Sequence, residues 1–373
     1  MISPLVAIVV VGLMFIVLNG MMWAGYWVLG KFYHVGEHEW GNEDIQVRIV
    51  DRGTPVGELQ ATINTIPDNI SSVHVITTEE GLDLEMDNVT IHQFPESFEC
   101  NALGKGRMYE WARRNVDTDS VEYVMYLGTK RHFIEFDGVP DKDIMVCRNR
   151  TRQSGSRWTY LADVLRMNKN HETSGYGATS FPMFATSRDV IIRANVEQDV
   201  TWNRPAFNIG SSFLWAANRE GYSFALTKNI TRVEAPSSVK AILRQKRKWY
   251  SGRVHDSIAY LPTLQWLLIS FRSTSWAAHT FAPLLILAGL FLTPFSFGLS
   301  IMATALIVLQ AVAGWYNTKE KPLVLIELLL KLPIILIIDG FGYIYGILKP
   351  VDERSLSETG AHFNVGRIND KSE

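Results

Sequence analysis

The sequence predicts an α/β domain with a mostly parallel sheet, joined to transmembrane helices at both ends of the chain. Short β-branched runs alternate with helix-forming segments between residues 45 and 127. Such strand–helix–strand alternation is typical of a parallel sheet covered by helices. Long apolar runs lie on both sides of this region, and about 20 apolar residues are enough to cross a bilayer.

Residues 1–32 are expected to form an N-terminal transmembrane helix. The stretch 2–30 carries no charged side chain and is longer than the apolar core of a signal peptide, which favours a transmembrane helix. A cleaved signal peptide is the alternative. Trp23, Tyr26 and Trp27 lie toward one end of the run, as aromatic side chains do where a helix leaves the membrane.

Residues 33–235 are expected to form the α/β domain. Strands are predicted at 45–51, 72–78, 89–95 and 121–127, and helices at 56–66, 102–115 and 157–167. A strand pair with a turn is predicted within 178–191, and a helix at 211–221 with a strand after it. Ligands of parallel sheets bind at the carboxyl ends of the strands. The turns after residues 50, 76 and 127 are therefore the first places to look for a site.

A basic helix is predicted to follow Pro236, with Ser237 or Ser238 as its N-cap. Gln245 and Trp249 are four residues apart and share one face of it. Residues 236–275 are accordingly predicted to be amphipathic helices at the membrane interface.

Residues 276–350 are expected to be a C-terminal transmembrane region of two to three segments, namely 276–294, 297–316 and 323–348. The last segment contains Glu327, Lys331 and Asp339. Charges inside a membrane are costly, so this segment is predicted to be broken or re-entrant. Residues 351–373 read as a polar tail.

The charge pattern predicts where the protein resides. Two lysines in the connection 317–322 place that loop in the cytoplasm by the positive-inside rule. Counting back through two spans places the main domain there too, so we expect an integral protein of the cell membrane or an equivalent membrane. A net charge of −2 shows no bias toward nucleic acid. Cys100 and Cys147 read as free thiols in a reducing compartment.

Four sequence stretches occur in an order that resembles a known family. They are VRIVDRG (47–53), CNALGKGRMYEWARR (100–114), FLWAANREGYSF (213–224) and QKRKWYSG (245–252). This series resembles the membrane-embedded family-2 glycosyltransferases, that is, cellulose and hyaluronan synthases and, most closely, egghead-type β-mannosyltransferases. QKRKW resembles the family's Q-x-x-R-W signature, with Lys248 in place of the usual Arg.

The resemblance implies a GT-A-type nucleotide-sugar domain. It further implies transfer of a sugar from a nucleotide sugar to a lipid-linked or polymeric glycan acceptor beside the lipid bilayer. In the family, the Gln and Trp of the signature lie at the acceptor end of the site, and its cation lies near the diphosphate. The implied substrate-binding residues are therefore Gln245, Arg247, Lys248, Trp249, Lys105 and Arg107.

The acidic motifs of the family are altered in this chain. After the second strand, where the family holds the nucleoside with an Asp, only Glu79 or Glu80 is present. The family's D-x-D pair, which binds Mg²⁺ or Mn²⁺, falls on Gly128 and Lys130. No metal ligands are therefore evident, although the resemblance implies a metal.

The family's general base is also missing, because its acidic pair falls on Ile209 and Gly210. Two functions stay open. In the first, the chain is an atypical enzyme in which Lys130 and Arg131 replace the metal, with His132 or Asp199 as the base. In the second, it is a catalytically inactive relative that acts as a membrane partner or scaffold. A glycan-conducting channel ranks behind both.

Overall fold

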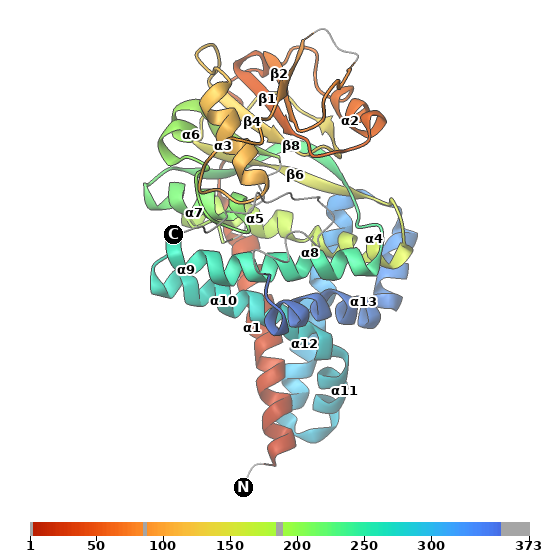
Figure 1. The fold of residues 1–373 in the computed structure, drawn as a ribbon. Helices are drawn as coiled ribbons and strands as arrows, with labels where there is room; N and C mark the ends of the chain where they lie inside the picture. Colours follow the sequence, from red (N-terminus) through yellow and green to blue (C-terminus); the bar gives the residue numbers. More distant parts are fainter. Residues whose placement is uncertain (1–2, 85–87, 184–188, 352–373) are drawn as a thin grey trace, which may run out of the picture.

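The computed structural model describes residues 3–84, 88–183 and 189–351. An α/β domain sits on a layer of helices, and a stem of three helices extends from the other side of that layer (Figure 1). The stem consists of α1 (Pro4–Phe32), α11 (Ala282–Leu292) and α12 (Pro294–Thr318). The layer consists of α8 (Val239–Ser251), α9 (Ser257–Tyr260), α10 (Thr263–Ala278) and α13 (Pro322–Leu348). Apart from residue 351, the predicted polar tail lies outside the described residues.

The sheet has eight strands in the order β3-β2-β1-β4-β7-β6-β8-β5. Neighbours among β1 to β4 are parallel, as are β6 and β8, and the remaining neighbours are antiparallel. The predicted α/β fold is therefore confirmed, in the form of a mixed sheet whose first half is parallel. The strands are β1 (Ile45–Val50), β2 (Ser72–Thr77), β3 (Val89–Gln93), β4 (Tyr123–Leu127), β5 (Arg131–Glu135), β6 (Ile144–Arg152), β7 (Val190–Arg193) and β8 (Phe224–Glu234).

The parallel half follows the predicted pattern closely. All residues of β1 and of β4 are buried, as expected for parallel strands covered on both faces. Val47 lies between Val73 of β2 and Met125 of β4. The connecting helices are α2 (Val56–Ile63) and α3 (Lys105–Asn115). This connectivity brings the carboxyl ends of β1, β2 and β4 to one edge of the sheet.

The second half contains elements that the sequence pattern did not indicate. They are β5, β6, α5 (Lys169–Thr179) and α6 (Ala194–Val200). Where a strand pair was predicted within 178–191, α5 occupies the first residues and β7 begins at Val190, while residues 184–188 lie outside the described residues. The predicted helices are present as α4 (Arg157–Arg166), α7 (Ile209–Arg219) and α8. Ser238 caps α8 by accepting a hydrogen bond from the Ala241 N–H at 3.2 Å.

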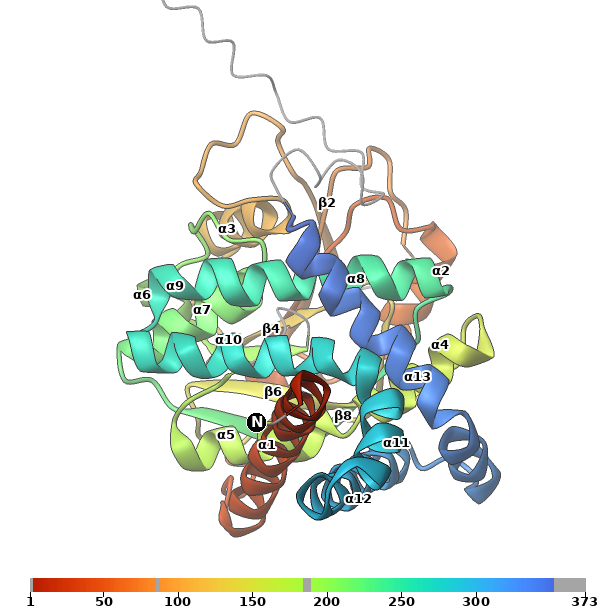
Figure 2. The same cartoon turned by 90° about the horizontal axis from the view of Figure 1, so that it is seen from below.

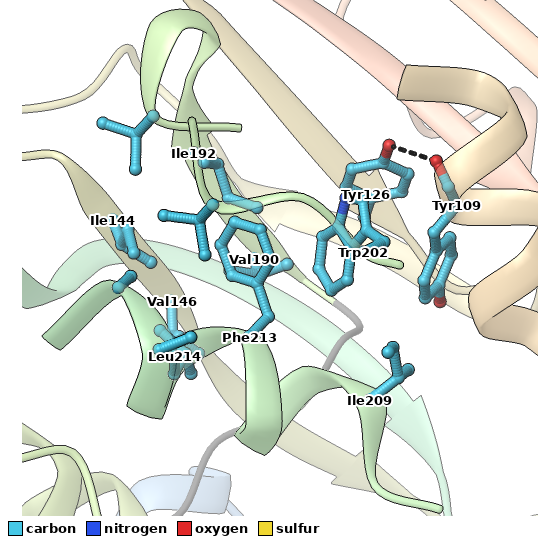
Figure 3. Packing of buried hydrophobic residues seen from close by; sticks show 14 of the residues in the cluster. Tyr109, Tyr126, Ile144, Val146, Val190, Ile192, Trp202, Ile209, Phe213 and Leu214 are labelled. Atoms are coloured by element: carbon cyan, nitrogen blue, oxygen red, sulfur yellow. Dashed lines mark hydrogen bonds between the residues drawn. The ribbon is translucent and has the colours of Figure 1, made fainter. Parts of the chain in front are cut away.

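A buried polar and aromatic cluster joins the two halves. Arg48 in β1 pairs with Glu197 in α6 at 3.1 Å, and both side chains are fully buried. The Trp202 indole donates to the same carboxylate at 2.7 Å. Figure 3 shows Trp202 packed among Tyr109, Tyr126 and Phe213 beside apolar strand residues. Because this pair is hydrogen-bonded on several sides, its burial is tolerated.

Among the described residues, three helical runs are long and apolar enough to cross a membrane, namely 4–32, 263–292 and 294–318. The second is bent at η3 (His279–Phe281), so that only α11 runs alongside α1 (Figure 1). Leu13, Ile16 and Ile307 pack inside the stem, whereas Ile8 and Phe291 are exposed on its outside. An apolar exterior of this kind suits a lipid environment.

Of the two alternatives predicted for residues 323–348, the broken helix is wrong. α13 is continuous through Pro333 and lies across α8 at the base of the domain (Figure 2). The charged residues that suggested a break are neutralised by ion pairs: Glu327 pairs with Arg157 at 2.5 Å and Asp339 pairs with Lys246 at 2.5 Å. The exposed apolar residues recur every three to four positions on this helix, at Leu323, Ile326, Leu330, Ile334, Ile337 and Phe341. This is the pattern of a helix lying in a membrane surface.

Candidate functional site

A cavity of about 710 Å³ lies between the α/β domain and the helix layer. It begins at Arg52 and Thr54, just after β1, where ligands of parallel sheets bind. It ends at Gln310 of α12 and Leu336 of α13, in the helices of the stem and layer. The cavity therefore connects the strand ends to the helices of the layer and the stem.

Basic side chains dominate the cavity wall. Ten Lys or Arg residues line it against three carboxylates. An excess of cations in a low-dielectric cleft attracts anions more strongly than the same charges in water. The basic residues are Arg52, Lys105, Arg131, Arg166, Lys169, Arg244, Lys246, Lys248, Arg253 and Arg272; the carboxylates are Glu172, Glu234 and Asp339.

Three helix N-termini also open into this cavity. Lys105, Lys169 and Ile209 line it and are the first residues of α3, α5 and α7, each of which has 11 residues. The N-terminus of a helix carries a partial positive charge, because the peptide dipoles of the helix are aligned. The convergence of the three N-termini adds to the attraction that the basic side chains exert on an anion.

The structure brings together part of the predicted site. Gln245, Lys248 and Trp249 of α8 line the cavity together with Lys105. The Lys105 ammonium donates to the carbonyl oxygen of Val50 at 3.2 Å, which holds it at the end of β1. The predicted face of α8 therefore does look into a cavity, and not toward the outside of the helix layer.

Trp249 stands among cations. Arg166, Lys246 and Arg253 lie 5.5, 5.1 and 5.4 Å from the centre of its ring. Contacts of this length are attractive, because the ring face is electronegative. The indole thus keeps three basic side chains at the cavity wall.

Three other predicted basic residues do not line the cavity. Arg107 donates to the backbone carbonyls of residues 96 and 98. Arg247 donates to the carbonyl oxygen of Lys349 at 2.6 Å and so holds the end of α13. Lys130 forms an ion pair with Glu58, and both side chains are about half exposed. These cations stabilise loops and surface, and a ligand in the cavity does not reach them.

The acidic and histidine candidates also lie elsewhere. Glu79 packs over Gly53 at the ends of β1 and β2. His132 pairs with a residue of β8 within the sheet, and burial, with Arg152 nearby, lowers its pKa. Asp199 is exposed and accepts a hydrogen bond from the Tyr222 hydroxyl at 2.7 Å. Neither His132 nor Asp199 touches the cavity, so this geometry provides no role for them as its base.

Sequence reasoning missed Lys169 and did not separate Arg131 from its neighbours. The Arg131 guanidinium pairs with Asp189 at 3.1 Å and donates to Asn149, which also lines the cavity. The surrounding protein and the nearby Arg166 and Arg131 lower the pKa of Lys169 well below its usual value. The sequence gives no sign of this lowered pKa, because a Lys at the start of a helix is usually exposed and only tertiary contacts bury it.

A carboxylate approaches the start of α7 from another element. Asp256 ends η2 (Gly252–Asp256) and accepts a hydrogen bond from the Asn208 N–H at 2.7 Å. Burial raises the pKa of Asp256 to about 7, although backbone N–H groups and Lys248 oppose the rise. Asn208 and Ile209 line the cavity. Asp256 itself is not a lining residue, but it lies directly behind Asn208, next to the start of α7 where the sequence lacks the acidic pair.

At the end of the cavity beside the layer and the candidate membrane helices, called the membrane end below, the charges are paired. Arg272 pairs with Glu172 at 2.9 Å and donates to the carbonyl oxygen of Asn19 at 2.6 Å. Lys246 pairs with Asp339. These contacts join α1, α5 and α10, and α8 with α13, so they hold the helix layer against the domain.

The chain matches a protein-family model described as "Glycosyl transferase family group 2" over residues 115–317. This match covers more than half of the 373 residues. The chain belongs to glycosyl transferase family group 2. The resemblance to family-2 glycosyltransferases is thus confirmed at the level of the family. No curated protein matches the sequence.

A solved structure shares the fold of this family-2 chain. It is the mannosyltransferase PcManGT from Pyrobaculum calidifontis, determined in complex with GDP-Man and Mn²⁺. The two chains superpose with a TM-score of 0.53 at 12% sequence identity, over 91% of this chain and 97% of the other. The shared length includes the helices outside the α/β domain.

Proposed function

We propose that this chain is a membrane-anchored glycosyltransferase that binds a nucleotide sugar in the cation-lined cavity. It transfers the sugar, with inversion, to a lipid-linked or polymeric glycan acceptor, as the egghead-type enzymes and the synthases do. The observation that carries the proposal is the cavity itself. Its ten basic residues and three helix N-termini lie between the ends of a parallel sheet and the membrane-level helices.

The donor fits the domain end of the cavity. Arg52 and Lys105 lie at the end of β1, where the phosphates of nucleotides bind in parallel sheets. A sugar nucleotide carries two negative charges on its diphosphate, which the helix N-termini and basic side chains attract. The similar mannosyltransferase structure holds GDP-Man, a donor of this chemical class.

The acceptor fits the side of the cavity that faces the membrane. Gln245 and Trp249 line that part together with Trp276 of α10. An indole offers a flat face to a sugar ring, and an amide can donate to and accept from its hydroxyl groups. A lipid-linked glycan would enter between the helices without leaving the bilayer surface.

In the transfer, the acceptor oxygen forms a bond to the anomeric carbon while the bond from that carbon to the diphosphate breaks. The acceptor hydroxyl loses its proton to a base, and the nucleoside diphosphate leaves with the electron pair. We assign the base role to Asp256, which does not line the cavity itself but accepts a hydrogen bond from Asn208 of the cavity wall, beside the start of α7, and has a pKa of about 7. A base with a pKa near the working pH is the most effective.

We infer that 4–32, 263–292 and 294–318 anchor the protein and that α13 lies in the membrane surface. The positive-inside rule assigns the loop 317–322 and the catalytic domain to the cytoplasm. Labelling of a single cysteine introduced at Lys319 tests this assignment. A membrane-impermeant maleimide should react in inverted vesicles, and reaction only in intact cells would contradict it.

The test of activity uses purified full-length protein in detergent with a panel of nucleotide sugars, and measures release of the nucleoside diphosphate. Wild-type protein should release it from at least one donor. Asp256→Asn should lower turnover by roughly 10²- to 10⁴-fold, the usual worth of a general base, and leave donor binding unchanged. Equal turnover of the variant would remove Asp256 from the mechanism.

A catalytically inactive relative is the second candidate, and a specific observation favours it. Gly128 and Lys130 follow β4, and Ile209 and Gly210 open α7, at the places where the family carries acidic pairs. Such a protein would bind the nucleotide sugar and act as a membrane partner or scaffold. Donor binding without any release of nucleoside diphosphate, over the whole panel and with several acceptors, would support it.

A further inference from the structure

The residues around the strand ends do not fit the divalent ion that the family implies. Mg²⁺ and Mn²⁺ take oxygen ligands, mostly carboxylates. Over the described ranges 3–84, 88–183 and 189–351, no group of three His, Cys, Asp or Glu residues could hold a metal ion. After β4 the chain continues with Gly128, Thr129 and Lys130. The nearby Asp189 already pairs with Arg131.

The basic side chain of Lys169 can supply the positive charge that a metal ion would otherwise bring. The side chain of Lys169 is only partly exposed and lines the cavity at the start of α5. Among the residues that the structure describes, no carboxylate lies at ion-pair distance from its ammonium group, in contrast to four other basic side chains of the wall, Arg131, Arg166, Lys246 and Arg272. A desolvated ammonium without a counter-charge is costly. A bound anion would remove that cost.

Arg131 lines the same cavity as Lys169, and it is held in a fixed orientation. Asp189 pairs with one of its nitrogens and the side chain of Asn149 accepts from the same group. Asn149 is in turn tied to α5, because the Asn170 side chain donates to its carbonyl oxygen at 2.8 Å. The contacts connect β5, β6 and α5 into one rigid wall behind Lys169.

We propose that Lys169, with Arg131 beside it, forms a diphosphate-binding site that works without a divalent metal ion. The proposal rests on the function proposed above and deepens it. The Lys169 ammonium faces the diphosphate as a point charge, while Arg131 offers a planar donor group. When the bond to the sugar breaks, the added negative charge on the leaving diphosphate falls beside these two cations.

The test is calorimetric titration of the full-length protein in detergent with sodium pyrophosphate, GDP and UDP, in EDTA and again with MnCl₂. We expect binding in EDTA, with affinity that changes less than about threefold when Mn²⁺ is added. Lys169→Gln should weaken binding by about tenfold or more, because a charge-assisted contact is lost. Lys169→Arg should keep most of it.

Lys130→Gln is the matched control, because Lys130 pairs with Glu58 outside the cavity and its loss should leave the titration unchanged. Thermal unfolding of each variant shows whether it is folded. Binding that requires Mn²⁺, or a folded Lys169→Gln variant with wild-type affinity, would overturn the proposal. If pyrophosphate binds in EDTA through Lys169 but neither nucleotide binds, the metal-free site is supported and the nucleotide-sugar function fails.

Discussion

The two ends of the cavity contain similar basic residues but treat them differently. At the membrane end, Arg272 and Lys246 each have a carboxylate partner within 2.9 Å. At the domain end, Arg131 pairs with Asp189, but no described carboxylate forms an ion pair with Lys169, whose pKa is lowered by its surroundings. Charges that the fold neutralises hold helices together, whereas a charge left without a counter-ion is available to a ligand.

The difference follows from where each end lies in the molecule. The membrane end is formed by helices that meet only in the tertiary structure, so their buried polar groups must satisfy one another. The domain end is formed by strand ends and helix N-termini, and the partial positive charge of a helix N-terminus favours an anion. Only this second arrangement is suited to bind and release an anion.

The largest effect is expected from breaking the paired end. Arg272→Met leaves Glu172 and the Asn19 carbonyl buried without a donor, which should lower the free energy of unfolding by about 3–5 kcal/mol. Denaturation in detergent measures it. The double variant Arg272→Met, Glu172→Met is the control and should regain most of the loss. A single variant as stable as wild type would mean that this pair does not hold the layer.

Asp256 offers a second test of how the two ends of the cavity treat charge, because it is a buried carboxylate beside the domain end. Its pKa is about 7 in the folded protein against 3.8 ordinarily, so the folded state keeps a proton that the unfolded state loses. The free energy of unfolding should therefore fall by up to about 4 kcal/mol as pH rises from 4 to 7. Above pH 7 it should stay level. Asp256→Asn should lack this slope. Chemical denaturation at several pH values measures it, and parallel curves for both proteins would contradict the shift.

Asp339→Asn tests whether pairing alone keeps the membrane end from binding anions. The substitution frees Lys246, which should strengthen pyrophosphate binding by about 1 kcal/mol, or roughly fivefold, or add a second weak site. Isothermal titration in EDTA measures the change. Leu336→Val, nearby on α13 and without charge, should have no such effect. An unchanged titration for Asp339→Asn would show that the two ends differ in shape as well as in pairing.

Trp249 lies between the two ends and should have a smaller influence. Its ring contacts Arg166, Lys246 and Arg253, and each such contact contributes about 0.5–2 kcal/mol. Trp249→Leu should weaken pyrophosphate binding a few-fold, because the three cations lose a common support, whereas Trp249→Phe should be nearly neutral. Equal loss in both variants would indicate that the indole N–H, and not the ring face, matters.

Much of the first half of the fold could be predicted because its signals are local. Buried parallel strands such as β1 and β4 read as continuous apolar runs, and Ser238 caps α8 as its position indicates. Within the site, Gln245 and Trp249 share a helix face, and helical periodicity alone shows this. The charged residues of α13 wrongly suggested a broken helix. The sequence around a Glu or Asp does not show that it will form an ion pair with a distant residue, as Glu327 does with Arg157 and Asp339 with Lys246.

The sequence by itself determined the α/β pattern, the apolar segments and the basic face of α8, because these depend on periodicity and composition within a few residues. Only the tertiary structure decided which charged groups lie in or beside the cavity. Lys169, Arg131 and Asp256 come from segments far apart in the chain. Their chemistry depends on desolvation and on the distance between charges, and both exist only after the helices have packed against the sheet.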